Sequence, residues 1–170
     1  GDPTASTKAM VRETYRIKQA LEASAAPTAR PKVFVPIWMD PLMTIHGDTY
    51  ASSMIHAVGA ENVFADRRRA YPLAADVGDA QPVPAEGRDT RYPRITLEEV
   101  EARAPDVILL PSEPHAFTEA DRKAFLATNT PAAKQGRVHF VDGRDLLWPG
   151  LRSLDGLDRL RALIGAAATA

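Results

Sequence analysis

Short apolar runs alternate with amphipathic segments along this chain. Val33–Trp38, Asp106–Leu110 and Arg137–Val141 are rich in β-branched and long aliphatic side chains, and each has the length of a buried strand. A shorter extended piece is expected at Glu61–Phe64. Because proline has no amide hydrogen, Pro36 predicts that the first strand ends early or lacks one ladder hydrogen bond.

Between these runs the apolar positions recur with helical spacing. Helices are expected at Thr7–Ala23, from Gly47 or Asp48 to about Val58, and at Thr96–Ala104, Thr118–Thr128 and Leu151–Ile164. Thr96 and Glu99 form a capping-box pattern, and Gly47 or Asp48 is expected to cap the second helix. Met39–His46 is expected to be a loop. Arg67–Pro93, which holds four prolines and two glycines, is expected to be a long irregular loop of functional importance.

This order of elements predicts an α/β fold. Alternating strands and helices indicate a single Rossmann-like lobe, with a mostly parallel sheet of about four strands and helices on both faces. In such sheets ligands bind beyond the carboxyl ends of the strands. The segments expected there are Trp38–Gly47, Ser112–Phe117 and Asp142–Gly150.

Composition narrows the function classes. The 170 residues suit one domain, and the absence of cysteine excludes a disulfide scaffold, a thiolate zinc site and a cysteine nucleophile. A net charge of -1 gives no basic excess for binding nucleic acid. No apolar run reaches the length of a membrane span, and no signal peptide precedes Gly1, which leaves a mature or a trimmed chain open.

The three strand-end segments contain the candidate site residues. These are Trp38, Asp40, Thr44, His46, Glu113, His115 and Trp148. Aromatic rings beside polar groups suit a flat, partly apolar ligand, although each tryptophan could instead cover an edge of the core. The histidines and carboxylates are ordinary metal ligands, but their spacing matches no metal motif, and hydrogen bonding within the loops is the alternative.

The residue types also allow an enzymatic function. Ser112, His115 and Asp142 supply the residue types of a hydrolase triad, but no G-x-S-x-G turn surrounds the serine. The chain also lacks the G-x-G-x-x-G and Walker loops of nucleotide-binding sites. Two alternatives to a ligand-binding protein are therefore open. One is a small α/β hydrolase that uses Ser112 and His115, and the other is a non-catalytic interaction module.

Several segments together resemble a known family. The order RPKVFVPIWMDPLMTIHGDTY, GAENVFAD, YPRITLEEVEARAPDVILLPSEPHAF and VHFVDGRDLLWPG resembles the C-terminal lobe of the helical-backbone substrate-binding proteins of ABC importers. The resemblance extends over residues 7–164. It rests on three features: the pattern G-x-E-N-x-F, a Tyr-Pro step, and a helix followed by P-D-x-I-L. The family includes periplasmic receptors for vitamin B12, haem and iron-siderophores.

The resemblance implies a two-lobed receptor, of which this chain is the second half. Residues 1–30 would be the end of the helix that joins the lobes together with a linker, and residues 31–170 would be the C-terminal lobe. The N-terminal lobe would be missing, or its surface would be supplied by a second copy. The resemblance also implies that the ligand-facing loops match Trp38–Gly47, Glu113–Phe117 and Arg144–Trp148.

The resemblance further implies a transport function without catalysis. The ligand would be a metal chelate (cobalamin, haem or a ferric siderophore) and no intrinsic cofactor or nucleic acid would be involved. Glu98 would match the surface glutamate that meets arginines of the membrane permease. The protein would be periplasmic or otherwise extracytoplasmic, and a lipid anchor on the full-length protein is one option.

Overall fold

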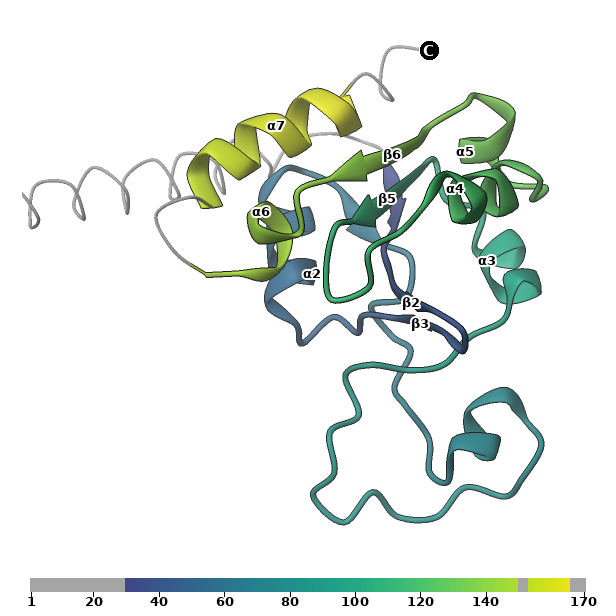
Figure 1. The fold of residues 1–170 in the computed structure, drawn as a ribbon. Helices are drawn as coiled ribbons and strands as arrows, with labels where there is room; N and C mark the ends of the chain where they lie inside the picture. Colours follow the sequence, from purple (N-terminus) through teal and green to yellow (C-terminus); the bar gives the residue numbers. More distant parts are fainter. Residues whose placement is uncertain (1–29, 150–152, 166–170) are drawn as a thin grey trace, which may run out of the picture.

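A four-stranded parallel sheet forms the centre of the protein (Figure 1). The computed structural model describes residues 30–149 and 153–165. Across the sheet the strands follow the order β4 (Glu61–Asn62), β1 (Lys32–Phe34), β5 (Val107–Pro111) and β6 (Val138–Val141). This confirms the predicted α/β class and parallel sheet. The helix predicted at residues 7–23 and the start of the linker lie outside the described residues.

The inner strand β5 explains why helices cover both faces. All five of its residues are buried, and successive side chains point to opposite faces of the sheet. Val107 and Leu109 pack into one hydrophobic cluster, and Ile108 and Leu110 into the other. The first cluster receives α2 (Tyr50–Ala57), α6 (Gly143–Leu147) and α7 (Ser153–Gly165), and the second receives α3 (Leu97–Arg103), α4 (Glu119–Leu126) and α5 (Pro131–Lys134).

The apolar run at residues 33–38 is not one strand, as the sequence suggested, but parts of two sheets. After β1 the chain leaves the parallel sheet at Pro36, which has no amide hydrogen to continue the ladder. It then forms an antiparallel hairpin of β2 (Pro36–Met39) and β3 (Leu42–Thr44). The loop predicted at residues 39–46 is therefore wrong over β3.

Local capping sets several helix starts. The predicted capping box of Thr96 and Glu99 is present at α3, and Thr118 caps α4. The predicted cap of α2 is wrong, because Thr49 accepts the amide of Ser52 there. The Asp48 carboxylate is occupied elsewhere, by a hydrogen bond from Arg68. The sequence analysis did not predict the short helices α5 and α6.

The segment at residues 67–93 forms the expected long loop, with a single 3-10 turn at Leu73–Val77, and it extends away from the sheet (Figure 1). Its two limbs are joined at the base. The amide of Arg69 donates to the Thr90 carbonyl at 2.8 Å. The buried Asp76 carboxylate accepts the amides of Ala70 and Arg94, one on each limb.

Candidate functional site

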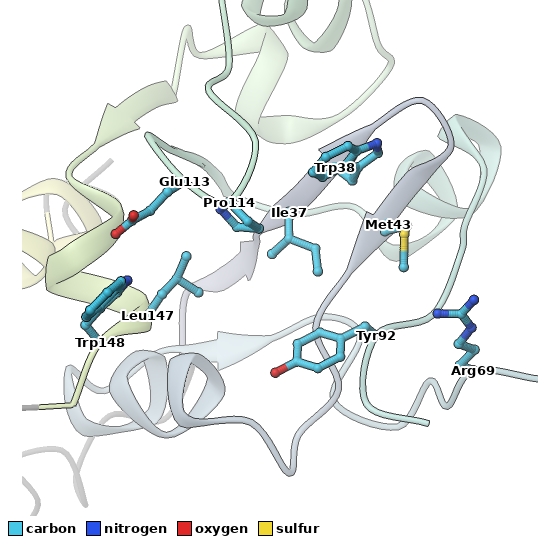
Figure 2. A pocket seen from close by; sticks show the side chains of 9 residues that line it. All are labelled: Ile37, Trp38, Met43, Arg69, Tyr92, Glu113, Pro114, Leu147 and Trp148. Carbon is cyan, nitrogen blue, oxygen red and sulfur yellow. The ribbon is translucent and has the colours of Figure 1, made fainter. Parts of the chain in front are cut away.

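A cavity of about 550 Å³ lies beyond the carboxyl ends of the strands (Figure 2). It is lined by Ile37, Trp38, Met43, Arg69, Tyr92, Glu113, Pro114, Leu147 and Trp148. The hairpin after β1, the loop after β4, and the segments after β5 and β6 each contribute to this lining. The segments that follow the four strands of the parallel sheet therefore meet at one site, as expected for this topology.

Aromatic and aliphatic side chains dominate the lining. Trp38, Tyr92 and Trp148 come from three different segments and surround a floor that includes Ile37 and Leu147 (Figure 2). Trp38 is 42% exposed and Trp148 is 63% exposed. Neither indole therefore closes the core. Exposed indoles beside a concave apolar floor are typical of a site for a large, flat, partly apolar ligand.

A row of ring contacts supports Trp38. Its indole nitrogen donates to the Asp40 carbonyl at 3.0 Å, and its ring lies 5.5 Å from the His115 ring. His115 in turn meets the edge of Phe117, which is buried in the core, at 4.7 Å. His115 thus lies behind the tryptophan and is not among the residues that line the cavity. Its Nε2 atom is buried without a hydrogen bond, 3.7 Å from Asp121.

Two charged side chains, Arg69 and Glu113, complete the lining. The Arg69 guanidinium lies over the Tyr71 ring, 5.1 Å from its centre. Among the residues that the structure describes, neither the Nε atom of Arg69 nor the Oε1 atom of Glu113, both buried, has a hydrogen-bond partner. Near Glu113, Arg144 is engaged by the Asp142 carboxylate, whose hydrogen bonds raise the pKa of the guanidinium.

Besides His115, three predicted residues are not in the cavity. Thr44 is fully buried, and its hydroxyl donates to the Val35 carbonyl at 2.8 Å. His46 is 6% exposed, and its Nδ1 accepts the amide of Asp48. Asp40 lies at the exposed turn of the hairpin, where its carbonyl holds Trp38. Thr44 and His46 therefore hold the hairpin and the following turn in place, and the structure does not bring them to the cavity with the tryptophans.

The residue types of a hydrolase triad are not joined by hydrogen bonds in the described structure. The Ser112 hydroxyl accepts the amide of Gly143 at 3.0 Å, and over the described residues no hydrogen bond joins it to His115. Within the same part of the chain, no three histidines, aspartates or glutamates are grouped as a metal site would require. What the cavity supplies is an apolar, aromatic surface with one cation and one anion.

Sequence reasoning missed Arg69 and Tyr92. Both belong to the long loop, Arg69 on its outgoing limb and Tyr92 on its returning limb. The available signal was the unusual length of that loop, which favours a functional role. Nothing in the sequence shows which of its residues turn toward the sheet.

Comparison with known proteins identifies the fold. No protein-family model and no curated protein sequence match this chain. The apo form of the periplasmic heme-binding protein RhuT from Roseiflexus sp. RS-1 shares its fold with a TM-score of 0.71 at 21% identity, over 99% of this chain and 59% of that one. The periplasmic vitamin B12 binding protein BtuF of Vibrio cholerae gives 0.67 at 19% identity, over 100% and 57%. An ABC-type Fe3+-hydroxamate transport protein from Saccharomonospora viridis DSM 43017 gives 0.64 at 18%, over 94% and 49%.

The fold is that of one lobe of these periplasmic binding proteins. This lobe spans between 49% and 59% of the three chains just described. The expected single α/β lobe is thereby confirmed at the level of the fold. Glu98 lies outside the cavity, exposed in the first turn of α3.

Proposed function

We propose that this lobe is the ligand-binding C-terminal half of the substrate-binding component of an ABC importer. Its ligand would be a metal chelate such as cobalamin, haem or a ferric siderophore. The observation that carries the proposal is the open cavity at the carboxyl ends of all four parallel strands, with Trp38, Tyr92 and Trp148 around an apolar floor. Such a surface covers one face of a flat ligand by burying apolar area and by stacking.

The other face of the ligand needs a second surface. The similar structures are longer than this lobe, which matches 59% or less of each. The N-terminal lobe of the full-length protein, or a second copy of this one, would close over the exposed indoles. Binding between two lobes requires no covalent chemistry, which agrees with the absence of a Ser112–His115 hydrogen bond in the described part of the chain.

The proposed location is outside the cytoplasm, where the similar proteins work as periplasmic receptors. Among the helices of the described residues, none combines the length and apolarity needed to span a bilayer. The proposed partner is an ABC permease. Glu98 is the candidate contact, because it is exposed on α3 and carries no ion pair within the described chain.

A ligand panel tests this proposal. The full-length protein is titrated with haem, cyanocobalamin and ferrichrome, and tryptophan fluorescence is followed. At least one chelate should quench the fluorescence with saturation. Trp148→Ala should weaken that binding by about tenfold or more, because a large aromatic surface is lost from the cavity.

Phe140→Ala is the matched control. Phe140 is also an exposed aromatic residue, 44% exposed on β6, but it does not line the cavity. Its removal should leave the affinity unchanged. Unresponsive titrations with all three chelates, or an equal effect of the two variants, would remove the proposed function.

A further inference from the structure

Charge is distributed unevenly in the cavity. Of the nine residues that line it, seven are aromatic, aliphatic, proline or methionine, and two are charged. Figure 2 shows Arg69 and Glu113 at opposite ends, with the apolar floor between them. Within the described structure no ion pair joins the two across the floor.

Within the part of the chain that the structure describes, Arg69 forms no ion pair of its own, although its charge helps to lower the pKa of the Asp89 carboxylate. Arg68 pairs with Asp48, and Arg91 pairs with Asp89 at 2.7 Å. Over the described residues, the close partner of the Arg69 guanidinium is the Tyr71 ring, which holds the planar group from one side without accepting a hydrogen bond in its plane. Because the Nε atom is buried, the terminal nitrogens of Arg69 are the donors that remain for a ligand.

The Glu113 carboxylate is also unpaired on the cavity side. Its Oε1 atom is buried without a hydrogen-bond partner. The nearest cation of its surroundings, Arg144, already shares two hydrogen-bonding nitrogens with the Asp142 carboxylate. A second acid placed at this end would therefore meet a carboxylate that forms no ion pair within the described chain, although Arg144 attracts it.

We infer that the cavity selects a chelate with an acidic edge, and that it orients this edge toward Arg69 and away from Glu113. This inference rests on the proposed function and narrows its ligand class. A guanidinium binds a carboxylate through two parallel hydrogen bonds, and the interaction is strong where ligand and protein exclude water. A chelate without an acid would cover the Arg69 cation without forming an ion pair with it.

The test compares chelates that differ only in acidity. Haem carries two carboxylates on one edge, and its dimethyl ester has the same ring and metal without those charges. With the full-length protein, haem should bind about tenfold or more tightly than the ester, and the difference should shrink at high salt. Cyanocobalamin and ferrichrome, which carry no free carboxylate, should bind more weakly than haem.

The variant Arg69→Gln should bind haem and its ester equally. Arg68→Gln is the matched control, because Arg68 is the neighbouring cation and pairs with Asp48 outside the cavity lining. It should keep the preference for the acid. Equal binding of acid and ester by the unmodified protein, or tightest binding of a neutral chelate, overturns this inference while the proposed function stands. If no chelate binds, the proposed function itself fails, and the inference fails with it.

Discussion

At the residue scale, the contact between Gly143 and Glu113 sets the shape of the cavity. A Cβ atom on Gly143 would lie 2.5 Å from the Glu113 Cγ atom and 3.0 Å from its backbone nitrogen. Gly143→Ala should therefore displace the segment that carries Glu113 and Pro114. Overpacking of this kind costs about 1–3 kcal/mol of the free energy of unfolding. Urea denaturation measures this loss, and titration with the chelate that binds should show a weaker affinity.

The control for this substitution is Gly165→Ala. Gly165 ends α7, and a Cβ atom there would meet nothing within 4 Å. Its substitution should leave ligand affinity unchanged and the free energy of unfolding equal or higher by up to about 1 kcal/mol. Equal urea midpoints and equal affinities for the two alanine variants would contradict the proposed contact.

The sequence predicted which residues lie at the strand ends better than it predicted which way their side chains point. The sequence placed Trp38, Glu113 and Trp148 at the strand ends, and all three line the cavity. It also placed Thr44 and His46 there, and both are buried. Thr44 is turned inward because Met39–His46, expected to be a loop, contains a strand whose neighbouring side chains alternate, so that Met43 faces the cavity instead.

At the element scale, the predictions succeeded where the signal is local. The capping boxes at Thr96 and Thr118 specify two helix starts, because each needs only residues within one turn. The short helices α5 and α6 were missed, since four or five residues are too few to show a helical period. The path of the loop at residues 67–93 depends on contacts between its distant limbs, which no local pattern reports.

One of those contacts gives a prediction for the loop. Asp76→Ala should lower the free energy of unfolding by about 3 kcal/mol, because the amides of Ala70 and Arg94 lose a buried acceptor. Arg67 would lose its ion pair with the same carboxylate. Urea denaturation measures the cost, and hydrogen exchange at both amides should accelerate.

Asp79→Ala is the control on the same loop, since Asp79 is exposed just after the 3-10 turn. Its unfolding free energy should stay within about 0.5 kcal/mol of the unmodified protein. If the two variants unfold at the same urea concentration, or if the Ala70 and Arg94 amides stay equally protected in Asp76→Ala, the carboxylate does not hold the limbs together.

At the scale of the whole molecule, the site is a product of topology. Parallel strands put all their carboxyl ends at one edge, so segments separated by up to 111 residues, from Ile37 to Trp148, meet in one cavity. The alternation of strands and helices was enough to predict this edge. It did not predict the depth or the charge of the cavity, because these depend on how the hairpin and the long loop pack against it.

The proposed transport function would also require a docking surface away from the ligand. Glu98 is exposed in the first turn of α3, where its backbone amide and the Thr96 hydroxyl lower the pKa of its carboxylate. The lowered pKa keeps Glu98 ionised at neutral pH and extends its charge to lower pH than an ordinary glutamate would retain it. Docking through this charge should therefore weaken at a lower pH than docking through an unperturbed glutamate would.

The substitution Glu98→Gln tests the docking role separately from ligand binding. It should weaken association of the full-length protein with its permease by roughly fivefold or more, mainly through a slower and less salt-sensitive association, because a rim charge acts on the encounter. Affinity for the chelate should not change, since Glu98 lies outside the cavity lining. Glu61→Gln, an exposed glutamate on β4, serves as the control and should dock normally. Unchanged association of Glu98→Gln in surface plasmon resonance at low salt would assign docking to another face of the lobe.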